Sequence, residues 1–198
     1  MAEFVLATRN SDKVREIRKI LPGIKFLSLK DFPNLPDIKE EGKTLRANAI
    51  HKAQEAVRYT GKMSIADDSG LEVEALGGKP GVRSSRFAGE KVSYEENNRE
   101  LLRLMNGKHR RGAKFKCVIA VAGSGMETVV REGVCRGRIA RFPRGKNGFG
   151  YDPLFIVSGT GKTFAELPPA IKNDISHRAK ALRKLAKYLH RFEDKRGM

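Results

Sequence analysis

Along the first third of the chain, short apolar runs alternate with segments whose apolar residues have helical spacing. Residues 3–7 form an apolar run, and the apolar residues between 14 and 21 recur at helical spacing up to a Pro-Gly pair. A second apolar run covers residues 26–29, and a second helical pattern follows Thr44. A third apolar run leads into two adjacent aspartates. The pattern predicts a strand-helix-strand-helix-strand order whose third strand ends at these aspartates.

The remainder of the chain mixes strands and helices in the same way. Residues 71–76 alternate apolar and acidic side chains, as in a half-exposed strand, and a long glycine-rich loop follows them. The pattern then predicts a helix over 93–105, a hairpin of two strands over 113–135, a strand over 154–157 and a helix after Ser176. No internal repeat or low-complexity linker divides the chain. We therefore expect an α/β fold in one domain that covers residues 1–198.

The charge balance is the one unusual bulk property. The 198 residues include 40 Lys and Arg against 23 Asp and Glu, which gives a formal net charge of +17. Such a surface attracts nucleic acids, and it attracts nucleotides for the same electrostatic reason. The basic residues are spread along the whole chain, without an aromatic-interleaved basic run or zinc-finger spacing. The charge alone does not choose between nucleic acid and a small polyanion.

The apolar runs are too short for a membrane protein. None approaches the roughly 20 residues that cross a bilayer, and the first residues lack the pattern of a signal peptide. We therefore expect no membrane partner and a cytoplasmic location. Cys117 and Cys135 lie in separate predicted strands without metal-type spacing, so we expect two buried, reduced thiols.

The two adjacent aspartates, Asp67 and Asp68, are the first candidates for chemistry. In open α/β sheets, ligands bind outside the carboxyl ends of strands. Paired carboxylates at such a position favour a hard cation such as Mg²⁺, which often bridges to phosphates. The alternative is a turn in which both aspartates only hydrogen-bond the local backbone.

The polar segment from Thr8 to Lys13 is the second candidate. Asn10 or Ser11 can cap the helix that follows, and Asp12 suits its first turn. Backbone N–H groups at the start of that helix, with Lys13 beside them, could also seat a phosphate group. The segment lacks the glycine spacing of a P-loop, so plain capping remains the alternative.

Motifs along nearly the whole chain resemble one family, the non-standard purine nucleoside triphosphate pyrophosphatases, which act on inosine and xanthosine triphosphates and their deoxy forms. In chain order they are Ala7-Thr8-x-Asn10-x-x-Lys13, Glu40-x-Gly42-x-Thr44 with Asn48-Ala49, Ala66-Asp67-Asp68-Ser69-Gly70-Leu71, Pro80-Gly81-Val82, Ser85-Arg86-Phe87, Gly148-Phe149-Gly150-Tyr151-Asp152-Pro153, Thr163-Phe164-Ala165-Glu166, and Lys172-Asn173 with Ser176-His177-Arg178.

The resemblance implies an elongated mixed β-sheet flanked by helices, two lobes with a central nucleotide cleft, Mg²⁺ dependence and a homodimer. Glu40 and Asp68 would bind the metal, and Asp68 would act as the general base, with Ser69 touching the substrate. The residues that would hold the triphosphate are Thr8, Arg9, Asn10, Ser11, Asp12 and Lys13. Those that would enclose the purine and the sugar are Phe149, Gly150, Tyr151, Asp152, Lys172, His177 and Arg178.

The expected activity is hydrolysis of ITP, dITP and XTP to the monophosphate and pyrophosphate. Hypoxanthine and xanthine carry a 6-oxo acceptor where adenine carries an amino donor. Donors from His177 and Arg178 would therefore favour inosine and xanthosine nucleotides. One alternative is a Maf-type pyrophosphatase, which prefers pyrimidine or modified nucleotides. The other is a basic nucleic-acid-binding protein, although nucleic acid is not the primary partner that the motifs indicate.

Several residues keep a structural interpretation open. His177 could be a surface histidine near the start of the last helix, and Tyr151 could be a packing residue. Glu166 is a secondary candidate that could equally be solvated. Asp67 could hold the loop while Asp68 works, or it could share the metal.

The chain departs from the family pattern at two positions. Arg9 stands where glycine is common, which adds positive charge to the phosphate turn. Ala47 stands where a glutamate is frequent, which removes one acidic contact near the metal. Glu40 and Glu41 remain, and we prefer Glu40 because of its spacing to Gly42.

Overall fold

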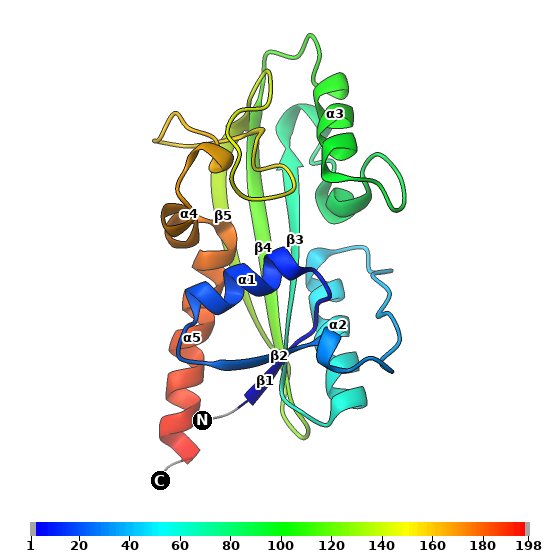
Figure 1. Ribbon diagram of the computed structural model, residues 1–198, viewed down its shortest axis with the longest axis vertical. Coiled ribbons are helices and arrows are strands. Elements are labelled where there is room, and N and C mark those ends of the chain that lie inside the picture. Colours follow the sequence, from blue (N-terminus) through cyan, green and yellow to red (C-terminus); the bar gives the residue numbers. More distant parts are fainter. Residues whose placement is uncertain (1–2, 197–198) are drawn as a thin grey trace. The chain divides into compact units, whose positions relative to one another are not determined.

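The computed structural model describes residues 3–196, and within them six strands form one sheet in the order β2-β1-β3-β4-β5-β6 (Figure 1). β1 pairs in parallel with β2 and with β3, whereas β5 pairs antiparallel with β6. The sheet is therefore mixed, and the predicted α/β class is confirmed. The strands are β1 (Glu3–Leu6), β2 (Lys25–Ser28), β3 (Ser64–Val73), β4 (Gly112–Ala122), β5 (Val129–Ile139) and β6 (Phe155–Val157).

α1 and α2 begin at the caps that the sequence predicts, whereas α4 was not predicted and begins without a side-chain cap. Asn10 precedes α1 and its side chain accepts hydrogen bonds from the backbone N–H groups of Asp12 and Lys13. Thr44 caps the next long helix, and Ser93 caps the third through a capping box. The helices are α1 (Ser11–Ile20), α2 (Leu45–Thr60), α3 (Tyr94–Leu104), α4 (Pro169–Ile175) and α5 (His177–Arg196).

The expected end of the third strand is wrong, because β3 continues through the aspartate pair to Val73. The neighbouring strand is the one that ends there. β1 pairs with β3 only as far as Leu6 opposite Ile65, and the amide of Ala7 makes the last bond, to the Ile65 carbonyl at 2.8 Å. Asp67 and Asp68 therefore lie just beyond the carboxyl end of β1, inside a continuous strand.

Two other element boundaries also differ from expectation. Residues Glu74–Leu76 form a 3₁₀ turn instead of extending the strand. The second hairpin strand begins at Val129 and runs to Ile139, four residues beyond the predicted end. Both differences lie at the ends of elements, where local sequence patterns are least informative.

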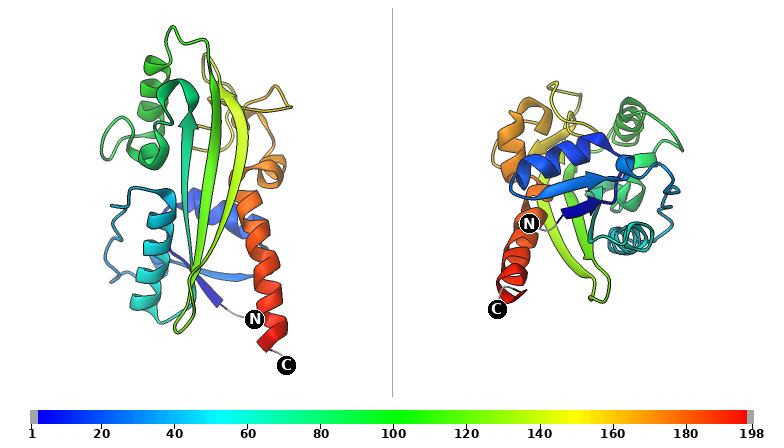
Figure 2. Two further views of the ribbon diagram at one scale, coloured as in Figure 1. Left: turned by 180° about the vertical axis from the view of Figure 1, so that it is seen from behind. Right: turned by 60° about the horizontal axis from the view of Figure 1, so that its bottom comes forward.

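The chain divides into two compact units, which share β3, β4 and β5. Unit 1 comprises residues 1–68, 117–133 and 178–198, and unit 2 comprises residues 69–116 and 134–177. In unit 1, α2 and α5 flank the strands from opposite sides, as Figures 1 and 2 both show. No helix among residues 3–196 is long and apolar enough to cross a membrane.

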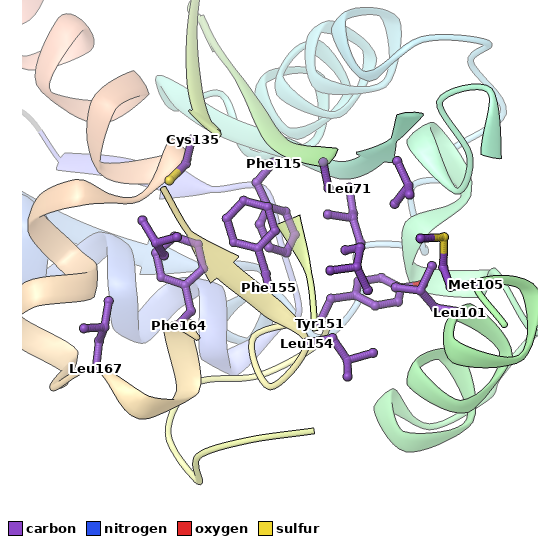
Figure 3. Close-up of a cluster of buried hydrophobic side chains, with 14 residues drawn as sticks. Leu71, Leu101, Met105, Phe115, Cys135, Tyr151, Leu154, Phe155, Phe164 and Leu167 are labelled. Atoms are coloured by element: carbon purple, nitrogen blue, oxygen red, sulfur yellow. The ribbon is translucent and has the colours of Figure 1, made fainter. Parts of the chain in front are cut away.

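Each unit has its own apolar core. That of unit 1 joins β1, α1, β4 and α5, through residues such as Leu6, Ile17, Ile119 and Leu182. That of unit 2 is rich in aromatic rings, with Phe115, Phe155 and Phe164 packed together (Figure 3). Cys117 lies in the first core and Cys135 in the second, and both are buried thiols as predicted.

Candidate functional site

Asp67 is a buried carboxylate of unit 1 that is surrounded by cations. The Lys13 Nζ lies 3.2 Å from its Oδ1, and Arg178 donates to its Oδ2 from Nε at 3.2 Å and from Nη2 at 3.1 Å. Burial raises the pKa of this carboxyl, but the charges of Lys13, Arg178 and Lys52 hold the pKa well below its usual range. Asp67 therefore stays ionised, and its contacts favour the structural role over a share in a metal site.

Arg178 is 2% exposed and ties three elements of unit 1 together. Arg178 is the second residue of α5. Its guanidinium donates to the carboxylate of Asp67 on β3 and pairs with the carboxylate of Glu16 on α1. Burial alone would lower the pKa of the guanidinium, but Asp67 and Glu16 raise it. Two carboxylates thus hold the side chain for which the family resemblance implies a contact with the purine.

Asp68 lies in a different environment from its neighbour. Its side chain is buried, and the Asn48 Nδ2 donates to its Oδ2 at 3.0 Å. Burial raises the pKa of this carboxyl, the negative charge of Glu40 raises it further, and the charge of Lys52 opposes both. A carboxylate whose pKa is raised in this way is better suited to accept a proton than an exposed aspartate is.

Lys52 is buried on α2 and links the acidic residues. Its Nζ donates to the backbone carbonyl of Asp67 at 2.8 Å, pairs with the Glu40 carboxylate, and lies 3.9 Å from Oδ1 of Asp68. Although burial raises the pKa of Glu40, the charge of Lys52 holds it below its usual range. The sequence interpretation missed this lysine. Its spacing was a usable signal, because Ala49, Lys52, Ala53 and Ala56 lie on one buried helical face.

The glycine of the second motif has a steric reason. The Gly42 amide donates to the Asn48 Oδ1 at 2.7 Å, which orients the Asn48 amide group toward Asp68. A Cβ added to Gly42 would lie 2.5 Å from that oxygen. The segment from Glu40 to Asn48 is therefore shaped around the position of the Asp68 carboxylate.

The polar turn before α1 is organised by its own side chains. The Asn10 Oδ1 accepts from the amides of Asp12 and Lys13 at 2.9 and 3.1 Å, and the Thr8 hydroxyl accepts from the amide of Asn10 at 3.2 Å. Arg9 turns away to the carboxylate of Asp37 at 2.8 Å. The capping interpretation is confirmed, and the extra charge of Arg9 is paired.

In unit 2, Asp152 and Lys172 form a buried ion pair next to an aromatic ring. The carboxylate of Asp152 also accepts from the backbone amide of Phe149 at 2.8 Å, and the Lys172 Nζ lies 4.7 Å from the centre of the Phe149 ring. Gly148 has φ +77°, and a Cβ there would lie 2.0 Å from Oδ2 of Asp152. These contacts hold the Phe149 ring in place beside an ammonium group.

The loop that carries Phe149 is anchored from two more positions. The Asn98 Nδ2 donates to the Gly150 carbonyl at 3.0 Å. Tyr151 lies in the apolar core of unit 2, where its hydroxyl donates to the Ser84 carbonyl at 2.9 Å (Figure 3). Burial raises the pKa of the Tyr151 phenol. The contacts of Tyr151 are those of the packing residue that the sequence left open.

His177 is only 4% exposed, and its ring stacks on Phe115 with centroids 4.6 Å apart and planes 9° apart. The surface-histidine alternative is therefore wrong. Glu166 instead pairs with Arg144 at 3.1 Å and caps a 3₁₀ turn with Thr163. Its pKa is lowered mainly by the backbone hydrogen bond of Thr163, as expected for a partly solvated cap.

Comparison with known proteins gives consistent matches over almost the whole chain. A model of the Ham1 family matches residues 4–188. The dITP/XTP pyrophosphatases of Geobacillus kaustophilus and Geobacter sulfurreducens are 51% and 49% identical, covering 93% and 96% of this chain and 93% and 97% of theirs. The HAM1 protein of Coxiella burnetii superimposes with a TM-score of 0.88 at 44% identity, covering 96% of this chain and 100% of that protein.

Proposed function

The chain belongs to the Ham1 family, and on this premise we propose that it hydrolyses the non-standard purine nucleoside triphosphates ITP, dITP and XTP. The products would be the nucleoside monophosphate and pyrophosphate. The observation that carries the proposal is the environment of Asp68, a buried carboxylate with a raised pKa that Asn48 holds beside Lys52.

Asp68 would act on water. A carboxylate that is fixed by one amide hydrogen bond can orient a water molecule, and its raised pKa allows it to take a proton from that water. The water oxygen would attack the α-phosphorus, the bond to the oxygen that bridges to the β-phosphorus would break, and pyrophosphate would leave. The ammonium groups of Lys13 and Lys52 provide positive charge near the carboxylates of Asp67 and Asp68, respectively, which would stabilise the negative charge of the triphosphate.

We propose Mg²⁺ as the metal, held by Glu40 and Asp68. Among the residues whose side chains the structure describes, 3–189, there is no cluster of three or more His, Cys, Asp or Glu that could enclose a metal. That fits Mg²⁺, which usually binds one or two protein carboxylates and completes its shell with water and substrate phosphates. The negative charge of Glu40 raises the pKa of Asp68, so a bound cation would relieve a repulsion that exists in this unit. When bound, Mg²⁺ would neutralise charge on the phosphate oxygens.

The purine would be recognised through the aromatic and basic residues of the last motifs. Phe149 offers a ring face, and the Asp152–Lys172 pair fixes the loop that carries it. Donors from Lys172 or His177 would suit a 6-oxo group and would be left unpaired by the 6-amino group of adenine. Leaving a buried donor unpaired is costly, and this cost would discriminate against ATP.

A kinetic panel tests the proposal. Purified protein is incubated with ITP, dITP, XTP, ATP, GTP and a pyrimidine triphosphate in the presence of Mg²⁺, and kcat/KM and products are measured for each. We expect the first three to be preferred and to yield pyrophosphate. Equal rates on all purine triphosphates, or release of orthophosphate, would overturn the proposal. Preference for the pyrimidine nucleotide would support the Maf-type alternative.

We also propose a homodimer in the cytoplasm, as the family resemblance implies. Light scattering of the purified protein measures the mass directly, and a monomer at micromolar concentration would exclude the dimer. The nucleic-acid alternative makes a separate claim, namely salt-sensitive DNA or RNA binding without nucleotide hydrolysis. Such binding in a protein inactive on the whole panel would favour that alternative.

A further inference from the structure

A cavity of about 500 Å³ lies within unit 2, and its lining is strongly basic. We call it the basic pocket and define it by the side chains that matter to the argument, which are His109, Arg111, Arg138, Arg141, Phe142 and Arg144. None of the residues that line it is acidic, and none is among the substrate-binding or metal-binding residues discussed above. The proposed activity therefore gives this pocket no role.

Arg111 is a fixed part of the pocket wall. Its Nε and Nη2 donate to the carbonyls of Ile139 and Ala140, each at 2.8 Å, and its Nη1 donates to the Met105 carbonyl at 3.1 Å. Burial lowers the pKa of Arg111, and so do the positive charges of Arg141 and Arg138. Like charges are thus concentrated in the pocket, at a cost that a bound anion would remove.

Arg138 and Arg141 are exposed, and neither forms an ion pair with a carboxylate in the part of the chain that the structure describes. Other exposed arginines do form such pairs, for example Arg58 with Glu55 at 2.7 Å and Arg103 with Glu100 at 2.7 Å. The guanidinium groups of Arg138 and Arg141 therefore remain available for an anion. Guanidinium groups bind phosphate oxygens with two parallel hydrogen bonds, which favours a phosphorylated ligand.

Arg144 completes the basic wall. Its carboxylate partner is Glu166, and its Nη2 donates to the Gly161 carbonyl at 3.0 Å. Its Nε is buried and makes no hydrogen bond among the residues whose side chains the structure describes, 3–189. Because this Nε has almost no accessible surface, a ligand does not reach it in this conformation, and Arg144 contributes to the wall as a guanidinium paired with Glu166.

Phe142 indicates which class of phosphorylated ligand the basic pocket would bind. It is 64% exposed, more than the other large apolar side chains at the surface, namely Tyr59, Tyr94 and Ile171. An exposed aromatic ring among arginines can stack on a nucleobase. The volume falls within the roughly 300–1,000 Å³ of small-molecule sites, whereas an extended nucleic acid would follow a longer groove. The lining therefore favours a compact ligand with a phosphate chain and a ring.

We propose that the basic pocket is a second, noncatalytic binding site for a nucleoside di- or triphosphate. Arg138 and Arg141 contact the phosphate groups, Arg111 keeps the wall in place, and Phe142 stacks on the base. The proposal does not depend on the proposed hydrolase activity, because it uses none of the residues assigned to that activity.

Calorimetric titration with ATP in EDTA, where hydrolysis is suppressed, tests the site. The variant is Arg138→Glu with Arg141→Glu, and the control is Lys30→Glu with Arg99→Glu, which changes the net charge equally at exposed positions outside the pocket. We expect at least about tenfold weaker ATP binding in the first variant, since two charge-assisted contacts are lost, and unchanged binding in the control. Equal ATP affinity in the two doubly substituted proteins would overturn the proposal that the basic pocket binds ATP.

Three further measurements define the ligand and the role. Phe142→Ala should weaken binding of ATP but not of inorganic tripolyphosphate. An equal loss of affinity for both ligands would contradict the proposed stacking of Phe142 on the base. A single-stranded oligonucleotide that binds through the same arginines far more tightly than ATP would contradict a compact ligand. The doubly substituted variant should keep its kcat on ITP, and a kcat that falls in proportion to ATP binding would contradict a noncatalytic site.

Discussion

Arg178 donates two hydrogen bonds to one carboxylate oxygen of Asp67, at 3.2 Å from Nε and 3.1 Å from Nη2, although 111 residues separate the two in the chain. Both side chains are buried, and Glu16 pairs with the same guanidinium. The start of α5 is thereby fixed to the strand that carries Asp68. An ion pair in this position fixes the chain next to the proposed catalytic carboxylate.

Replacing Arg178 by alanine should destabilise the protein by about 3–5 kcal/mol, because Glu16 loses the guanidinium that pairs with it and Asp67 keeps only the neighbouring lysines. Urea unfolding measures this free energy. Lys187→Ala, an exposed change on the same helix, is the control and should stay within about 0.5 kcal/mol of the wild type. A loss below about 1 kcal/mol for Arg178→Ala would mean that the buried network is not formed.

Replacing Asp68 by asparagine should lower kcat on ITP by about 10²-fold or more, because the amide cannot accept the proton from water. The fold should persist, since burial already disfavours the charged form of Asp68. Circular dichroism and urea unfolding check the fold while a pyrophosphate assay checks the rate. An Asp68→Asn variant with near wild-type kcat would exclude Asp68 as the base.

Replacing Gly42 by alanine should reduce kcat about tenfold or more and should also cost about 1–3 kcal/mol of stability, because the buried Asn48 must move. The added Cβ would lie 2.5 Å from the Asn48 Oδ1 and would displace the amide that positions Asp68. Gly23→Ala is the matched control, because a Cβ at Gly23 meets nothing within 4 Å. Equal kcat values for the two variants would show that Asn48 does not position Asp68.

Tyr151 should make the stability of the protein fall with rising pH above about 10. Burial raises the pKa of its phenol in the folded state, so the unfolded chain loses this proton first, and ionisation then favours unfolding. Tyr151→Phe should lose about 1 kcal/mol at neutral pH, with the hydrogen bond to Ser84, and should show a weaker decline above pH 10. Parallel declines of the two proteins in urea unfolding at alkaline pH would contradict the buried phenol.

Local patterns predicted the elements whose signals lie within a few residues. Asn10 and Thr44 cap the helices at whose starts the sequence placed them, because capping depends on a side chain and the next three amides. The strand through Asp67 and Asp68 was predicted to end too early. Its course depends on its neighbours in the sheet, and β1 ends at Leu6, far away in the sequence.

The motifs predicted the main residues of the candidate site, but they did not predict the side-chain contacts that hold these residues in place. Asp68 and Glu40 were predicted together, but Lys52 and Glu16 became visible only through the contacts of α2 and α1. The basic pocket was hidden for the same reason. Its arginines come from residues 111 and 138–144, which meet where the Ile139 amide donates to the Arg111 carbonyl at 2.8 Å.

The most direct test of the proposed reaction is hydrolysis of ITP in oxygen-18 water with Mg²⁺, followed by mass spectrometry of the products. If a water positioned by Asp68 attacks the α-phosphorus, the products are IMP that carries one oxygen-18 and pyrophosphate that carries none. Oxygen-18 in pyrophosphate would place the attack on the β-phosphorus. Release of orthophosphate, or no turnover of ITP at all, would contradict the account.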